Sequence, residues 1–220
     1  MTHHIMLQKK EPGCPLGVFD AILLDRFREN GKDTNYGYLP WYSSPGSQPF
    51  PDGLCLITTF KRFSFDIRSD SSFFYVVSSR FVEAFTEAGG VFEDCKQVEV
   101  RSQRGALLAL QYHVCRFTSH DVDEVSRPDL MECSQDEFLP HPKRLEIRDD
   151  FKAPVFKVKK LSARVNLPFC SEAFRKIAQR MQLRGIQFEN AHGFNWPAAM
   201  PFAQEFLAVA SGKLPIRLPL

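Results

Sequence analysis

Residues 169–189 read FCSEAFRKIAQRMQLRGIQFE, and this stretch decides the fold. An apolar run ends at Ser171, a residue type that caps helices by accepting a bond from a backbone N–H group. The apolar residues behind the cap have the spacing of an amphipathic helix, at Phe174, Ile177, Ala178 and Met181. Gly185 then ends the helix, and a short apolar segment follows. The pattern predicts a strand, a capped helix and a second strand.

An earlier stretch, residues 76–94, has the same order of features and reads VVSSRFVEAFTEAGGVFED. A shift of 93 residues places Ser78 on Ser171 and each apolar position of the first helix on one of the second. Beyond the helix, residues 92–94 align with residues 188–190, which makes the second copy a few residues longer. Residues 73–98 and 166–190 are therefore candidate repeat units. A duplication explains this likeness, but so does shared packing physics, because the same packing rules apply to any two strand-helix-strand units.

Further strands are predicted from apolar, β-branched runs, and a last helix from a capped amphipathic segment. The strands are Leu54–Phe60, Phe73–Val77, Ala106–Phe117 and Val155–Leu161, and the helix is Pro201–Ala210. The predicted fold class is α+β, with a mixed, mostly antiparallel sheet and a few packed amphipathic helices. A length of 220 residues suits one globular domain over residues 1–220.

Composition excludes several classes of protein. With 44% hydrophobic and 25% charged residues, the chain matches an ordinary globular protein, and no apolar run approaches the roughly 18 residues that span a bilayer. A net charge of +2 gives no chain-wide attraction to nucleic acid or anionic lipid. The six cysteines include no C-x-x-C pair, which indicates reduced thiols. We expect a cytoplasmic protein without a nucleic-acid or membrane partner.

Motifs for chemistry are absent from the sequence: there is no phosphate-binding glycine loop, nucleophile elbow or H-E-x-x-H. The nearest approach to a metal cluster is His113, Cys115, His120, Asp121 and Asp123. We interpret these as ordinary strand and solvated residues, since no second ligand pair has closed-site spacing. The sequence predicts no catalytic residues, no metal, no cofactor and no small-molecule ligand. The alternative is a hydrolase or transferase that works through Cys115, His113 or His192.

Two segments are candidates for binding a partner. Residues 31–53 form an irregular, proline-rich loop with three tyrosines and a tryptophan, which act either as interface anchors or as a cover for one end of the core. These are Tyr36, Tyr38, Trp41 and Tyr42. Between Asp121 and Glu137, seven acidic residues stand against one arginine, a local charge of −6. Such a run is either a solvated loop or a surface facing a basic partner, and the candidate contacts are Asp121, Asp123, Glu124, Asp129 and Glu132.

Several short motifs resemble the immunity proteins encoded beside bacterial polymorphic toxins and type VI secretion effectors, particularly the myxobacterial-type immunity domain. That family tends to close with a "Val-Ser-Glu"-like helix start and a "Gly-Val-Glu-Phe"-like strand. Their equivalents here are Phe169-Cys170-Ser171-Glu172 and Gly185-Ile186-Gln187-Phe188. The acidic turn at residues 121–126 also resembles that family's mid-chain element. The resemblance covers residues 73–190, and the loop at 31–53 has no counterpart in it.

The resemblance implies a non-catalytic inhibitor. Such a protein binds one cognate toxin or effector in the bacterial cytoplasm and occludes its active site through a protein-protein interface. We therefore expect a toxin-immunity complex, with the aromatic loop and the acidic segment as its contacts.

Overall fold

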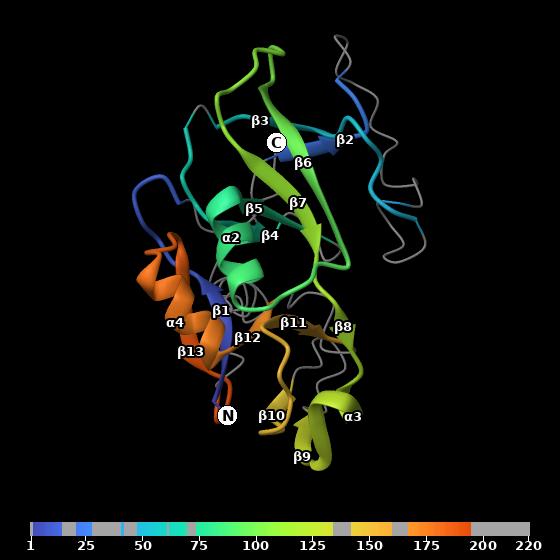
Figure 1. The fold of residues 1–220 in the computed structure, drawn as a ribbon, viewed down its shortest axis with the longest axis vertical. Helices are drawn as coiled ribbons and strands as arrows, with labels where there is room; N and C mark the ends of the chain where they lie inside the picture. Colours follow the sequence, from blue (N-terminus) through green and yellow to red (C-terminus); the bar gives the residue numbers. More distant parts are fainter. Residues whose placement is uncertain are drawn as a thin grey trace, which may run out of the picture.

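The computed structural model describes residues 2–14, 21–27, 41, 48–60, 62–69, 74–133, 142–159 and 167–194, and of residues 127–133 and 142–144 it describes the backbone alone. The predicted helix at 201–210 lies outside the described residues. The fold is α+β, as predicted, with mostly antiparallel sheets and few helices (Figure 1). The single-domain organisation stays a prediction.

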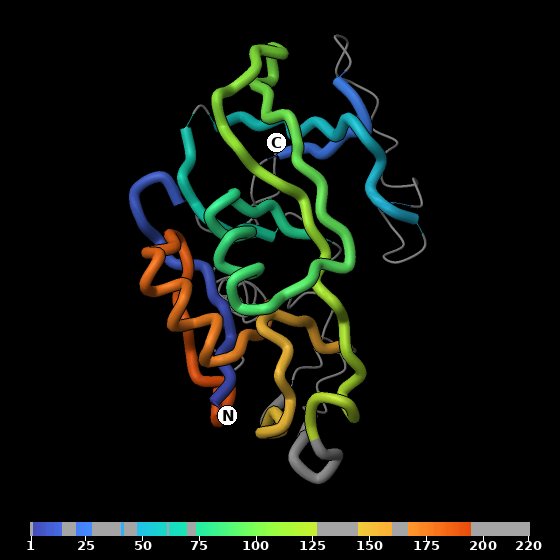
Figure 2. The backbone as a smooth tube through the Cα atoms, viewed as in Figure 1, coloured from blue at the N-terminus to red at the C-terminus, as the bar shows by residue number. Residues whose placement is uncertain are grey.

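The first sheet has six strands in the order β2-β3-β6-β7-β5-β4. Its neighbours are antiparallel except for the parallel pair β3 and β6. The strands are β2 (Ala21–Leu24), β3 (Cys55–Thr58), β4 (Ile67–Ser69), β5 (Tyr75–Ser78), β6 (Asp94–Ser102) and β7 (Tyr112–Arg116). The end of the β6–β7 hairpin projects beyond the rest of this sheet, at the top of Figure 2.

The second sheet has five strands in the order β13-β1-β12-β11-β8. They are β1 (His3–Gln8), β8 (Ser119–His120), β11 (Val155–Val158), β12 (Phe169–Ser171) and β13 (Ile186–Asn190). A separate two-stranded ribbon pairs β9 (Ser126–Cys133) with β10 (Pro142–Ile147). Three helices complete the described elements, namely α2 (Ser79–Glu87), the single-turn α3 (Val122–Val125) and α4 (Glu172–Arg180).

One core joins both sheets through α2 and α4. Phe81 and Phe174, one from each helix, are fully buried with ring centroids 5.4 Å apart. Their cluster includes Tyr75 from the six-stranded sheet and Met6 from the five-stranded sheet. Each helix begins as the sequence predicts, because Ser78 accepts a bond from the backbone N–H of Phe81 and Ser171 accepts one from Phe174.

Strand order and register match in the two sheets. The order β6-β7-β5-β4 corresponds to β13-β1-β12-β11, and every neighbouring pair in both is antiparallel. His113 lies opposite Val77 and Gln97, and His4 lies opposite Cys170 and Asn190. Both partners of His113 therefore map onto the partners of His4 by the same shift of 93 residues. A common origin of the two units stays a prediction.

Two details of the sequence interpretation are wrong. The register makes Cys95, rather than Phe92, the equivalent of Phe188, so the second copy carries no insertion before this strand. The strand predicted at 106–117 is shorter, because only residues 112–116 pair as β7. Residues 106–111 form the hairpin end, where a single bridge joins Arg101 to Leu107. Apolar character alone predicted a strand there, although the segment lacks the β-branched residues that favour one.

Candidate functional site

The acidic segment begins at the single turn of α3, where local contacts hold two of its carboxylates. Glu124 accepts a bond from the backbone N–H of Asp121 at 3.2 Å, which satisfies a free donor at the start of the turn. Asp121 also pairs with Lys159 at 3.1 Å, and Glu124 with His120 at 3.2 Å. Asp123 is exposed and forms no ion pair within the described part of the chain. Asp123 is therefore the carboxylate here that a partner can reach without breaking an internal contact.

The other two predicted acidic contacts, Asp129 and Glu132, lie on strand β9 of the two-stranded ribbon. Glu132 is in register with Arg144 on β10. The ribbon and α3 lie together at one end of the molecule, away from the β6–β7 hairpin (Figure 1). The structure thus places all five predicted acidic residues in one region.

Trp41 is the one predicted aromatic contact within the described residues, and it lies in the core at 7% exposed. Its ring meets Phe50 edge-on at a centroid distance of 6.4 Å, and its carbonyl accepts a bond from Arg116. The Arg116 guanidinium lies 4.0 Å from the centre of the Phe50 ring and 3.5 Å from a carboxylate oxygen of Asp94. Trp41 therefore covers the core and offers no ring at the surface. Tyr36, Tyr38 and Tyr42 lie outside the described residues.

The cysteine and histidines of the alternative enzyme hypothesis do not form an activated pair. Cys115 is fully buried, and burial raises the pKa of its thiol well above the ordinary value, whereas a nucleophilic cysteine needs a lowered pKa. His113 lies on the same face of β7, but its Nδ1 atom has no hydrogen-bond partner. His192 lies in the turn after β13 and pairs with Glu146 at 3.3 Å. These contacts supply no base for the Cys115 thiol.

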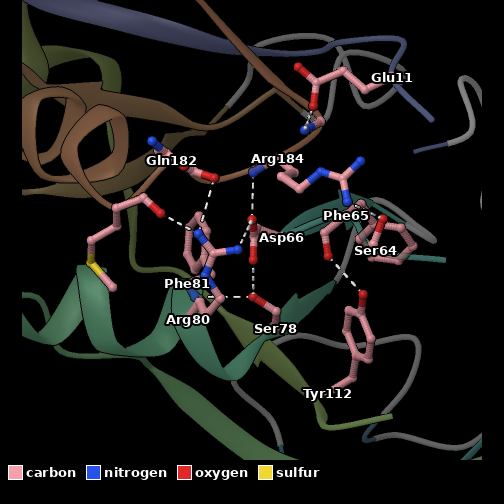
Figure 3. A network of polar contacts seen from close by, with 12 residues as sticks. Glu11, Ser64, Phe65, Asp66, Ser78, Arg80, Phe81, Tyr112, Gln182 and Arg184 are labelled. Carbon is pink, nitrogen blue, oxygen red and sulfur yellow. Dashed lines mark hydrogen bonds and ion pairs between the residues drawn. The ribbon is translucent and has the colours of Figure 1, made fainter. Parts of the chain in front are cut away.

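Sequence reasoning missed a buried polar network that joins the two sheets (Figure 3). Asp66, only 2% exposed, precedes β4 and accepts bonds from the Ser78 hydroxyl and, at 2.5 Å, from the Arg184 backbone N–H. Arg80 at the start of α2 lies 4.0 Å from the same carboxylate and donates to the carbonyls of residues 181 and 182 after α4. The bond from the Arg184 N–H to Asp66 and the bonds from Arg80 to residues 181 and 182 join this first unit to the end of α4. We call this network of Asp66, Ser78, Arg80 and Arg184 the clasp, because it connects the two units.

Arg68 extends this clasp from β4 toward the loop after β1. Its guanidinium, 2% exposed, donates to the carbonyls of Ile67 at 2.7 Å and Gly185 at 2.8 Å. Burial lowers the pKa of Arg68, with Cys14 among the groups that oppose this effect. Gly185 has φ +74°, and a Cβ atom there would lie 2.8 Å from the guanidinium. The glycine therefore permits both the left-handed turn and the close approach of Arg68.

A surface ion cluster ties β1 to α4. Glu172 binds His4 at 2.7 Å and takes two bonds from Arg175, both 2.6 Å long. The Arg175 bonds, with a smaller contribution from His4, lower the pKa of Glu172 to about 2. Its position in the first turn of α4 also suits a carboxylate, because the helix dipole is positive there. This cluster holds together an interface between two segments that are far apart in the sequence.

No sequence pattern predicts either the clasp or the ion cluster around Glu172. Asp66 and Arg68 alternate with apolar residues as in any half-exposed strand, and their partners at 184 and 185 are over 110 residues away. Burial of these charges becomes visible only once the two units are packed together.

Neither a protein-family model nor a curated protein matches the chain. In the part of the chain that the structure describes, no three His, Cys, Asp or Glu side chains are grouped so as to hold a metal ion. Among the same residues, no helix is long and apolar enough to cross a membrane.

Proposed function

We propose that this chain is a bacterial immunity protein that binds and neutralises one cognate secreted toxin or effector in the cytoplasm. The proposal rests on the sequence motifs and on one structural observation, the position of α3 and strand β9, which carry the predicted acidic residues, at one end of the molecule. The chain acts in this proposal as an inhibitor that covers the toxin's active site and carries out no reaction itself.

Charge on this surface supports a basic partner. Asp121 and Glu124 have internal partners, Asp123 is exposed, and Asp129 and Glu132 lie on the neighbouring strand β9. Clustered carboxylates complement a Lys- or Arg-lined cleft, of the sort that binds nucleic acid or phosphate, and speed the encounter with it. The proposed target is therefore a toxin with a basic active-site cleft.

Asp123→Lys tests the surface without disturbing the local fold, because Asp123 makes no ion pair among the described residues. The partner is first captured from the native host with the full chain and then expressed alone, where we expect it to stop growth unless this chain is co-expressed. Association of the purified pair is then measured across an ionic-strength series. The variant should associate about three- to tenfold more slowly at low salt and approach the wild-type rate at high salt.

Glu83→Lys on the exposed side of α2 is the matched control, since it changes the net charge equally at another site. If both variants slowed association equally, α3 would not be part of the interface. A captured partner that is harmless when expressed alone would overturn the immunity function itself.

A further inference from the structure

We propose that the outer edge of β13 is a dimerisation surface, on which the β13 strand of a second copy of this chain pairs in antiparallel orientation. Strand β13 is an end strand of the five-stranded sheet, and it lies with β1 and α4 at the left of Figure 1. Within the described part of the chain it pairs with β1 alone. The inference goes beyond the proposed function, because the acidic segment begins next to β8, at the opposite edge of this sheet.

Alternate backbone groups of β13 point away from β1. The Lys9 N–H donates to the Gly185 carbonyl and the Ala191 N–H donates to the His3 carbonyl, both at 2.9 Å. Bonds in an antiparallel ladder recur at every second residue, so the odd-numbered residues of β13 are those bonded to β1. The outward-pointing N–H and C=O groups are those of Ile186, Phe188 and Asn190. A row of unpaired groups of this kind is a template for another strand.

The first unit covers the equivalent edge with its own chain. Strand β6 corresponds to β13 in strand order, and residues 52–58 run along its outer side. Lys96 of β6 pairs with Asp52 at 2.7 Å. The Glu99 N–H donates to the Leu54 carbonyl at 3.0 Å, and β3 then pairs in parallel with the end of β6. None of the described residues forms such a cover beside β13, so the second unit has an open edge where the first has a covered one.

Strand β13 lacks the features that keep edge strands from pairing with other chains. Those features are a short strand, lysine or proline within it, and β-bulges. The five residues of β13 keep an unbroken register with β1 and include neither lysine nor proline. The other end strands of the two sheets are shorter, with four residues in β2, three in β4 and two in β8. Of these end strands, β13 is therefore the one best suited to accept another strand.

The sequence of β13, IQFEN, specifies a second copy because it is complementary to itself in antiparallel order. A two-fold axis at Phe188 produces the pairs Phe188–Phe188, Gln187–Glu189 and Ile186–Asn190. In this register the outward-pointing residues of the two copies meet one another, and they form about six backbone hydrogen bonds. The ring of Phe188 is half-buried, so it gains an aromatic contact across the axis.

Side chains on the other face of β13 complete the match. Gln187 is exposed and donates one amide hydrogen to Glu189 of its own strand at 2.6 Å. A primary amide has a second hydrogen and a carboxylate a second oxygen, so each Gln187 also has a donor for Glu189 of the second copy. A register shifted by two residues places either Gln187 or Glu189 opposite itself, and two carboxylates opposite each other repel. The polar side chains therefore favour the register centred on Phe188.

Opposite charges at residue 187 test this register, because they should change dimerisation in opposite directions. Analytical ultracentrifugation of the full chain at micromolar to millimolar concentrations should show a reversible monomer–dimer equilibrium. Gln187→Glu places carboxylates opposite each other twice in the dimer and should raise its dissociation constant about tenfold. Gln187→Lys forms two ion pairs instead and should lower the constant about three- to tenfold.

Gln103→Glu and Gln103→Lys are the matched controls, because Gln103 is exposed at the end of the β6–β7 hairpin and the net charge changes equally. Both should change the dissociation constant by less than about twofold. An unchanged urea midpoint in all four variants verifies that each is folded.

Amide hydrogen exchange followed by NMR shows whether the edge of β13 forms the interface. The amide hydrogens of Ile186, Phe188 and Asn190 should exchange quickly in the dilute monomer and become protected as the dimer forms. Those of Gln187 and Glu189 should be protected at every concentration, since they are bonded to β1.

Several results would overturn the inference. The chain could stay monomeric throughout, or its dimer could respond alike to both charges at residue 187. Protection of the Phe188 amide in the dilute monomer would assign the edge to another segment of the same chain. The acidic segment is untouched in the Gln187 variants, and Asp123→Lys leaves β13 unchanged, so a failure here is distinct from a failure of the proposed function.

Discussion

A comparison of the variants Ser78→Ala and Ser171→Ala measures how much stability the buried clasp adds to that of a helix cap alone. The two serines occupy equivalent positions with nearly identical backbone angles, and each accepts one N–H bond, at 3.1 Å and 3.2 Å respectively. Loss of either cap costs about 1 kcal/mol. Ser78 alone also donates to Asp66, which is 2% exposed. Removing a donor from a buried carboxylate costs about 1.5–3 kcal/mol more.

The free energy of unfolding should therefore fall by about 2.5–4 kcal/mol for Ser78→Ala and by about 1 kcal/mol for Ser171→Ala. Urea denaturation followed by circular dichroism gives both values, provided that the m value, the slope of the unfolding free energy against urea concentration, is the same in both variants and the wild type. An Asp66→Ala and Ser78→Ala double-mutant cycle should show a coupling of about 1–3 kcal/mol. Equal losses for the two serine variants, together with zero coupling, would refute a stabilising role for the Asp66 contact.

Two further predictions concern the contacts between the units. Glu172→Gln should lower stability at pH 7 by about 1–2 kcal/mol. Because the pKa of Glu172 is lowered from 4.5 to about 2 on folding, this difference should shrink as the pH falls through that window, and a pH-independent difference in urea midpoint would contradict it. Gly185→Ala should cost more than Gly193→Ala, since both have positive φ but only a Cβ at Gly185 meets the Arg68 guanidinium, at 2.8 Å. Equal losses in thermal denaturation would rule out this steric contribution.

The sequence was sufficient to predict the local elements whose signals are contiguous. Ser78 and Ser171 are followed at once by an apolar helical stripe, so cap and period agree and both helices form where expected. Strand β1 gave no such signal, because its pairing depends on residues near 170 and 190. The ribbon β9–β10 was likewise missed, since its polar residues predict a solvated loop equally well.

The candidate sites were predicted less completely, for a related reason. Acidic residues cluster along the chain, so counting them was enough to identify the acidic segment that begins at α3. Counting could not show that Asp121 and Glu124 have internal partners in Lys159 and His120. Trp41 was open to two interpretations, and it is buried in a core cluster that includes Tyr112 and Val114, more than 70 residues away. Which side chains share one face of the six-stranded sheet likewise depends on register, which no local pattern specifies.

The position of β1 inside the five-stranded sheet affects the order in which the parts of the protein fold. This strand lies between β12 and β13, so it leaves the ribosome long before the two strands that pair with it. Residues 21–116 can pair earlier, because all six strands of their sheet lie within that range. Until β12 and β13 have been synthesised, the apolar side chains of Ile5 and Met6 are without their native cover, which makes the nascent β1 segment a natural binding site for a chaperone.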